Sequence, residues 1–170
     1  MRTPKTRAAR AERDISHAVT TLYQIHYRSL VRLAALLVSD LATAEDIVQE
    51  SFTTLHGMRR TLRDADAGLC YLRRSVVRRS RSAPQLQLAG GTPDLPGDGP
   101  EASLPLQGSA VVSALRALPV RQREVLVLRY FVDLPEAEIA SATGIRTAAV
   151  RSHAARAMSS LRAELGPAGE

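Results

Sequence analysis

Apolar residues recur at helical spacing along most of the chain. Between Val19 and Leu37 they return every three or four positions, which predicts an amphipathic helix with one buried face. Asp40 and the residues after it interrupt this pattern. No segment shows the two-residue alternation of a half-buried strand, so the pattern predicts an all-α fold. The inward positions of this first helix are Val19, Leu22, Tyr23, His26, Leu30, Leu33, Ala34 and Leu37.

Two further helices are predicted before residue 84. Thr43 is followed three positions later by Asp46, which is close to a capping box and places the start of the second helix. The third helix runs from about Asp66 to Ser82 and ends before Pro84, which cannot continue a helix. The buried positions of these two helices are Ile47, Val48, Phe52 and Leu55, then Leu69, Leu72 and Val76.

The last third of the chain predicts four more helices. They lie over about 109–117, over 120–131 ("VRQREVLVLRYF"), within "LPEAEIASATG", and over "RTAAVRSHAARAMSSLRAEL". Pro119 suits a helix start, and Pro135 falls in the first turn of the next helix. The helices before and after the middle of the chain therefore predict two small bundles.

Residues 83–108 separate the two bundles. They are rich in Gly and Pro and contain three acidic residues but no basic one, which is typical of a flexible linker and predicts lobes that move independently. The predicted organisation is a disordered basic arm (1–15), a first lobe (16–82), the linker (83–108), a second lobe (109–165) and a tail (166–170). Residues 1–82 carry a net charge of +7 and residues 109–170 a net charge of +2, so the positive charge lies in the lobes.

The net charge of +6 favours an acidic partner such as nucleic acid. All basic residues except Lys5 are Arg, which suits phosphate recognition and equally fits a GC-rich genome. The single cysteine, Cys70, suits a reducing cytosol. No apolar run is long enough to cross a membrane, and no secretory signal is recognisable, so a cytoplasmic protein is expected.

Catalytic chemistry has little support in the sequence. There is no nucleophile–base pair and no phosphate-binding loop, so an enzyme is not expected. No cofactor or metal is expected either, because the histidines are scattered and form no ligand pattern. These histidines are His17, His26, His56 and His153.

A helix-turn-helix pattern spans residues 138–158. It needs a small residue where the helices cross, a residue tolerant of a left-handed backbone in the turn, and an apolar residue that packs back. Ala140, Gly144 and Val150 meet these needs, and Thr147 can cap the second helix. Such a helix can lie in the major groove of DNA. Its outward positions are Arg146, Thr147, Ala148, Arg151, Ser152, His153 and Arg156.

Two stretches together resemble one bacterial family. "LYQIHYRSLVRLAALLVSDLATAEDIVQESFTTLH", with "AEDIVQESF" (44–52) at its core, resembles the second conserved region of the extracytoplasmic-function (ECF) sigma factors of the sigma-70 family. "ALPVRQREVLVLRYFVDLPEAEIASATGIRTAAVRSHAARAMSSLR" resembles their fourth region. The resemblance covers about 16–82 and 109–165, and the order of the regions, the linker and the total length also fit.

The resemblance implies an initiation subunit of RNA polymerase that is not itself an enzyme. The first lobe would grip a coiled coil of the largest polymerase subunit and would read and melt the −10 promoter element. The second lobe would contact the flap of the other large subunit and read the −35 element as duplex DNA. The implied location is the cytoplasm, on the nucleoid when bound to polymerase, without membrane insertion and with a monomeric free form. Many relatives also bind an anti-sigma factor, which the aliphatic grooves of both lobes could accept.

The resemblance also places the contact residues. Acidic and amide side chains on the second helix suit a basic partner helix. The arginines of the third helix repel one another, and phosphate contact relieves this repulsion. The resemblance implies that the 57–68 loop captures a flipped base of the melted strand, for which the arginines of this loop would supply positive charge. The polymerase-binding residues are Glu45, Asp46, Gln49 and Glu50; the −10 residues are Arg59, Arg60, Arg63, Tyr71, Arg73, Arg74, Arg78 and Arg79.

Four positions depart from the family pattern. Trp is frequent where this chain has Tyr71, Asn where it has Arg78, Ser where it has Arg146 and Thr where it has Ala149. Arg78 replaces an amide by a charge and so changes the −10 surface. Arg146 removes the usual helix cap.

Two other classes of protein are open alternatives. The first is a homodimeric helix-turn-helix regulator that binds a palindromic operator; the long linker between two basic lobes argues against it. The second is a sigma-like interaction protein without promoter activity. Co-purification with core RNA polymerase distinguishes the regulator from the sigma factor.

Overall fold

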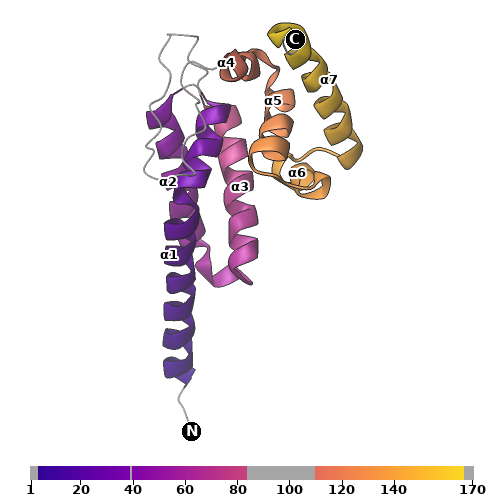
Figure 1. The fold of residues 1–170 in the computed structure, drawn as a ribbon. Helices are drawn as coiled ribbons and strands as arrows, with labels where there is room; N and C mark the ends of the chain where they lie inside the picture. Colours follow the sequence, from indigo (N-terminus) through magenta and orange to yellow (C-terminus); the bar gives the residue numbers. More distant parts are fainter. Residues whose placement is uncertain (1–3, 39, 84–109, 167–170) are drawn as a thin grey trace.

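The computed structural model describes residues 4–38, 40–83 and 110–166, and these residues form helices joined by short turns without any strand. The predicted all-α fold is therefore confirmed. The first lobe contains α1 (Pro4–Leu37), α2 (Leu41–Gly57), the short 3₁₀ turn η1 (Arg59–Thr61) and α3 (Ala65–Ser82). The second contains α4 (Ala110–Ala117), α5 (Val120–Leu126), a π-helical turn η2 (Val127–Phe131), α6 (Glu136–Thr143) and α7 (Thr147–Leu165) (Figure 1).

The first lobe is a three-helix bundle with an aliphatic core. The predicted stripes of α1, α2 and α3 meet there, and Val48, Leu55 and Leu72 are fully buried. Tyr23 was predicted to face inward, yet its side chain is 42% exposed because it lies at the edge of the bundle. Its ring stacks on Tyr27 at 4.7 Å and meets the edge of Phe52 at 5.0 Å.

Acidic side chains cap the two shorter helices of this lobe. Asp40 accepts hydrogen bonds from the Thr43 amide (2.8 Å) and the Thr43 hydroxyl (2.6 Å), so Asp40 is the N-cap of α2. The prediction that Thr43 begins this helix is therefore wrong, because Asp40 has the extended backbone of a cap and Thr43 lies inside the first turn. Asp64 caps α3 in the same way by accepting from the Ala67 amide at 2.8 Å.

Helix α1 extends far beyond the predicted start of ordered structure. Residues 4–15 were assigned to a disordered arm, but α1 begins at Pro4 and continues without a break to Leu37. The segment after Pro4 has no Gly or Pro and is rich in Ala and Arg, which have high helix propensity. Glu12 also anchors it to the bundle by ion pairs with Arg59 (3.3 Å) and Arg60 (2.8 Å).

The second lobe forms around a buried arginine. The guanidinium of Arg123 donates to the carbonyl oxygens of Leu115 (3.1 Å), Arg116 (2.7 Å) and Leu118 (3.1 Å), which lie at and just after the C-terminal end of α4, where helix carbonyls lack partners within the helix. Burial, together with the nearby charge of Arg116, lowers the pKa of Arg123. Arg123 therefore fixes the angle between α4 and α5. The predicted helix over 120–131 is present as α5 and its continuation η2.

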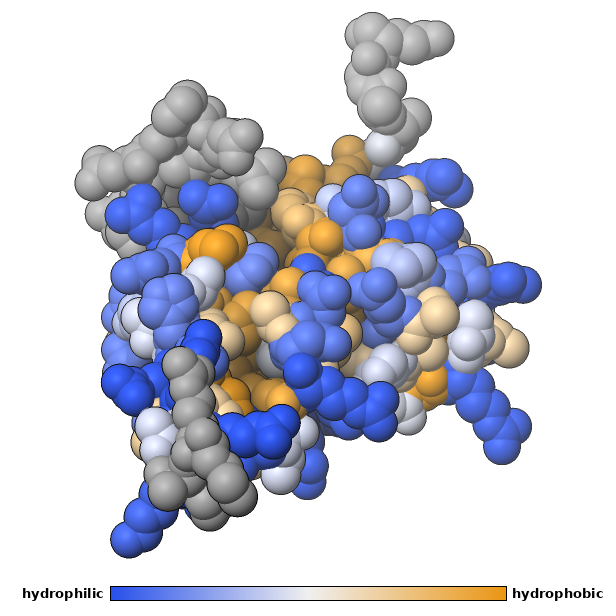
Figure 2. Space-filling model, turned by 90° about the horizontal axis from the view of Figure 1, so that it is seen from below, coloured by the Kyte–Doolittle hydropathy of each residue, from blue (hydrophilic) through white to orange (hydrophobic). Residues whose placement is uncertain are grey.

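The two lobes pack against each other. Helix α3 lies beside α6, and buried side chains of both lobes belong to one continuous apolar cluster. Figure 1 shows α3 between α1 and the helices of the second lobe, and Figure 2 shows apolar surface bordered by hydrophilic side chains on the face seen from below. The sequence predicted lobes that move independently, whereas the described lobes are in direct contact. Apart from Ala83, the predicted linker lies outside the described residues.

Replacing Asp40 by Ala should lower the free energy of unfolding by about 1 kcal/mol, because α2 loses its cap. Asp40→Asn keeps an acceptor oxygen, so its free energy of unfolding should fall by only about a few tenths of a kcal/mol. The hydrogen bonds from Thr43 lower the pKa of Asp40, so its contribution is present at neutral pH and disappears as the pH falls through that pKa. Urea unfolding at neutral and acidic pH measures both effects; equal losses for the Ala and Asn variants would contradict the capping role.

Candidate nucleic-acid interface

Helices α6 and α7 form the predicted helix-turn-helix. Gly144 joins them with a left-handed backbone (φ 73°, ψ 23°), and its amide donates to the Ala140 carbonyl at 2.9 Å. Ile139 and Val150 are fully buried where the helices cross, as predicted. The turn therefore has the geometry that presents the first residues of α7 on the outside of the lobe.

The predicted outward residues of α7 divide into two groups. Six of them are exposed, whereas His153 is half-buried and its Nδ1 atom has no hydrogen-bond partner among the described residues. Arg146 occupies the N-cap position without a side-chain hydrogen bond, and Thr147 is the first helical residue. The prediction that Thr147 caps this helix is therefore wrong, because the chain enters the helix one residue earlier. The exposed residues are Arg146, Thr147, Ala148, Arg151, Ser152 and Arg156.

The guanidinium of Arg151 is held by its own lobe. Its Nε atom donates to Glu136 Oε2 at 2.7 Å, and the second oxygen of Glu136 is 3.8 Å from Arg129. The pair is mostly solvent-exposed on the arginine side, since 73% of the Arg151 side chain is accessible. An exposed pair of this kind is weak, so a phosphate or a base edge can replace the carboxylate.

The arginines of α3 have different environments. Arg79 is engaged within the lobe: it bonds Glu50 (2.6 Å), Thr54 (3.1 Å) and Ser75 (3.2 Å), which assigns it a structural role. Arg74 and Arg78 are exposed and form no ion pair with the described residues. They line an open hollow of about 690 Å³ between α2 and α3, together with the half-buried Tyr71.

The loop between α2 and α3 is tied to the N-terminal part of α1. Arg59 and Arg60 are paired with Glu12, as described above, while Arg63 is exposed. Arg63 borders a small hollow of about 190 Å³ that is lined by apolar side chains such as Ile15 and Leu62. The positive charge of this loop was predicted from the sequence, but no pocket was; the structure places an apolar hollow directly beside the loop.

The acidic and amide face of α2 is accessible. Asp46, Gln49 and Glu50 are exposed, whereas Glu45 is half-buried. The Gln49 side chain is 3.5 Å from the Tyr27 hydroxyl, and Glu50 is held by Arg79. The four residues predicted for polymerase binding thus share one helix, and among them only Glu50 forms an ion pair with a described residue. Asp46 and Gln49 are the exposed members of the set without such a pair.

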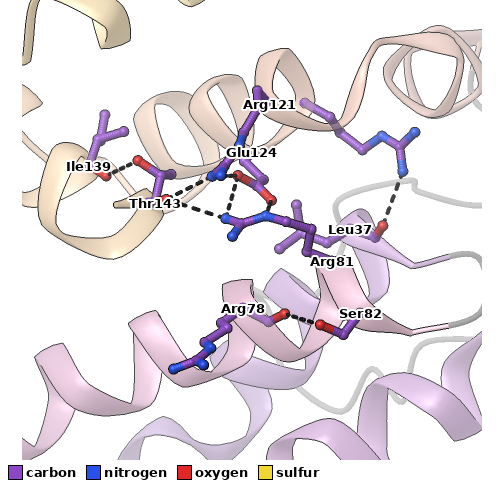
Figure 3. Close-up of polar contacts among 9 residues, drawn as sticks. Leu37, Arg78, Arg81, Ser82, Arg121, Glu124, Ile139 and Thr143 are labelled. Atoms are coloured by element: carbon purple, nitrogen blue, oxygen red, sulfur yellow. Dashed lines mark hydrogen bonds and ion pairs between the residues drawn. The ribbon is translucent and has the colours of Figure 1, made fainter. Parts of the chain in front are cut away.

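A cluster of charged side chains between the lobes was not predicted from the sequence. The carboxylate of Glu124, with a side chain only 2% exposed, accepts from Arg81 Nε (2.9 Å) and Nη2 (3.0 Å) and from Arg121 Nη1 (3.2 Å). Both arginines also donate to the Thr143 carbonyl, Arg121 at 2.7 Å and Arg81 at 3.3 Å. Figure 3 shows Glu124 between the two guanidinium groups. In the sequence Glu124 follows the polar residues 121–123 in the predicted helix 120–131, so nothing in the pattern marks it as buried.

Neither a metal site nor a membrane span is found where the structure describes the chain. No cluster of three or more His, Cys, Asp or Glu side chains is arranged to hold an ion among the described residues. In the same ranges, no helix combines the length and apolar character needed to cross a bilayer.

These features define a DNA-binding protein of the helix-turn-helix class with a second, basic helical lobe. Residues 109–161 match the family model "Sigma-70, region 4". The chain is 32% identical to the ECF RNA polymerase sigma factor SigL of Mycobacterium tuberculosis, with 95% of both chains covered. It is 30% identical to the RNA polymerase sigma-E factor of Streptomyces coelicolor, covering 81% of this chain and 80% of the relative.

A solved structure supports the same assignment over the whole fold. The structure of CnrH in complex with the cytosolic domain of CnrY matches with a TM-score of 0.71 and 25% identity, covering 93% of this chain and 94% of that one. The chain therefore belongs to the ECF sigma factors, and it acts in transcription initiation with RNA polymerase.

Replacing Gly144 by Val should lower the free energy of unfolding by about 1–2 kcal/mol, because an L-residue is disfavoured at this positive φ. A Cβ atom at this position would meet no other atom within 4 Å, so the expected loss comes from backbone strain. Gly144→Asn should therefore be much milder, since Asn tolerates the left-handed region. Thermal unfolding of both variants measures the difference, and similar losses would argue for a steric cause.

Proposed function

We propose that this sigma factor reads a −35 element with α7 and a −10 element with α3 and the 57–68 loop, while α2 binds the largest subunit of core polymerase. The observation that carries the proposal is the exposed N-terminal face of α7, which the glycine turn presents beside exposed arginines. A helix presented in this way can reach base edges in the major groove. The relatives' names favour this role over a homodimeric regulator.

The −10 assignment is supported by the free arginines of α3. Arg74 and Arg78 are solvated and unpaired in the described chain, so they can bind phosphate without breaking an internal contact. Tyr71 beside them offers an aromatic face for a base. The hollow next to Arg63 is mainly apolar, with Asp14 and Asp64 also in its lining, and we assign it to a base displaced from the stack. Arg79 takes no part in this contact, because its hydrogen bonds are used inside the lobe.

The polymerase assignment is supported by the accessible face of α2. Asp46 and Gln49 present a carboxylate and an amide on a rigid helix, which suits a basic helical partner. The second lobe would contact the other large subunit, and the protein would act in the cytoplasm, where polymerase meets the nucleoid. An anti-sigma factor is a further proposed partner, because the structural relative CnrH was solved with the cytosolic domain of CnrY.

Replacing Asp46 and Gln49 together by Ala should weaken binding to core polymerase by about tenfold to a hundredfold, because the interface loses its charged and amide contacts. Helicity should be unchanged, since both side chains are exposed and Ala favours helix. A binding titration with purified core enzyme measures the affinity, with circular dichroism as the folding check. Unchanged affinity would remove this face of α2 from the interface.

Two arginines of α7 are expected to have different roles in DNA binding. Arg151 lies early in the helix, so Arg151→Ala should lose about 1–3 kcal/mol on the matched −35 duplex and much less on a scrambled one. Arg156 lies further along, so Arg156→Ala should weaken both duplexes similarly and reduce the salt slope by about one unit. Binding of the polymerase holoenzyme to both duplexes over a salt series separates the two outcomes. Equal losses for Arg151→Ala on both duplexes would leave Arg151 with an electrostatic role only.

A further inference from the structure

The carboxylate of Glu136 connects the two helices of the helix-turn-helix. Its Oε2 atom accepts a hydrogen bond from Arg151 Nε at 2.7 Å, and its Oε1 atom lies 3.8 Å from Arg129 Nη1. Glu136 is the first residue of α6, and Arg151 lies in the second turn of α7. The side chain of Glu136 is 29% exposed, whereas that of Arg151 is 73% exposed. The acidic end of the pair is therefore partly enclosed by the lobe, and the basic end faces solvent.

The local structure holds Glu136 in place. Pro135 precedes it as the N-cap of α6, and the proline ring fixes the backbone at the start of the helix. A negative charge is favoured in the first turn of a helix, where amide groups lack partners within the helix. Arg129 neutralises the second carboxylate oxygen, and its guanidinium lies 5.8 Å from the centroid of the Tyr130 ring. Glu136 is thus a supported acceptor toward which the longer side chain of Arg151 turns.

The pair occupies only one donor group of Arg151. Its Nε atom is bound to Glu136, and neither Nη group has a hydrogen-bond partner among the described residues. Arginine recognises the O6 and N7 atoms of guanine with two neighbouring N–H groups. The edge formed by the two Nη groups is available for that contact while Nε stays on the carboxylate. DNA therefore need not displace Glu136 in order to reach Arg151.

A guanidinium held in one direction favours base readout over phosphate contact. An unrestrained arginine has many rotamers and can turn to a phosphate, which is present on every sequence. Ordering the side chain at a base edge costs conformational free energy, and this cost is smaller when a partner already restricts the side chain. The negative charge of Glu136 also repels the phosphates of matched and unmatched DNA alike. Both effects raise the difference between the two affinities, which is what specificity measures.

We propose that Glu136 is a positioning residue for promoter recognition: it directs the Nη edge of Arg151 toward a base of the −35 element and weakens binding to unmatched DNA. This inference rests on the proposed function, in which α7 reads that element. The base that fits is guanine, because guanine presents two acceptors side by side in the major groove. Loss of the Glu136 carboxylate releases Arg151 to contact phosphate, so binding becomes less selective.

The test compares the affinities of the polymerase holoenzyme for two promoter duplexes that differ only in the −35 element, one matched and one scrambled. Glu136→Gln should bind the scrambled duplex more tightly, because a negative charge near the phosphates is lost. The ratio of matched to scrambled affinity should fall about twofold to fivefold, the range of an exposed ion pair. Glu136→Ala also removes the acceptor oxygen and should lower the ratio further. Thermal unfolding of each full-length variant checks the fold.

A double-mutant cycle separates positioning from a general effect of charge. In an Arg151→Ala background, Glu136→Gln should leave the ratio unchanged, because no guanidinium remains to be directed. Glu138→Gln is the matched control, since it removes the same charge from the same turn of α6. The Glu138 carboxylate lies 3.7 Å from Arg73 of α3 and forms no pair with Arg151, so this variant should keep the wild-type ratio.

The outcomes distinguish this inference from the proposed function. If the wild-type holoenzyme does not distinguish the two duplexes, the proposed reading of the −35 element fails. If it does, and Arg151→Ala lowers the ratio but Glu136→Gln leaves it unchanged, the positioning role is overturned and the proposed function stands. An equal gain of affinity on both duplexes for Glu136→Gln would mean that the carboxylate only competes with DNA. A fall in the ratio that is just as large without Arg151 would overturn the inference as well.

Discussion

The burial of two adjacent charged residues of α5, Arg123 and Glu124, is the constraint on which the arrangement of the helices depends, because each needs its own polar partners. Neither side chain can be buried alone, because an unpaired charge inside a protein is strongly unfavourable. Arg123 reaches the carbonyl groups at the ends of α4 and α1, and Glu124 reaches Arg81 and Arg121. The angle of α4, the position of α5 and the contact between the lobes all follow from satisfying these two groups. The apolar cluster provides most of the burial, but it does not by itself select this geometry.

The arginines of the chain serve two purposes that composition cannot separate. Some complete internal networks: Arg79 links α3 to α2, and Arg123 closes the end of α4. Others, such as Arg74 and Arg78, remain solvated and can bind an anion. The basic character of the protein is thus partly structural. A count of positive charges overstates the surface that can bind DNA, and the hydrogen-bond partners of each guanidinium give the better measure.

The fold could be predicted from sequence because helical periodicity is a local signal. The stripe of Val48, Phe52 and Leu55 and the glycine turn at Gly144 required no knowledge of the rest of the chain. The helix starts were less certain, since Asp40 and Thr43 both offer a capping oxygen and only the backbone conformation decides between them. The ordered start of α1 was missed because its stabilising partners, Arg59 and Arg60, are distant in sequence. The Arg81–Glu124 pair could not be predicted for the same reason, as 43 positions separate its members.

Helix α1 holds two distant contacts at a fixed separation. Glu12 meets the 57–68 loop near one end, and the Leu37 carbonyl meets Arg123 at the other; 25 residues of continuous helix, or about 37 Å, lie between them. Insertion of one residue would turn one contact by about 100° relative to the other and would break the register of the buried face. Insertion of seven residues nearly restores the angle but shifts the contacts apart by about 10 Å. A change of helix length between Glu12 and Leu37 would therefore separate these two contacts, whereas a change before Glu12 would leave both in place.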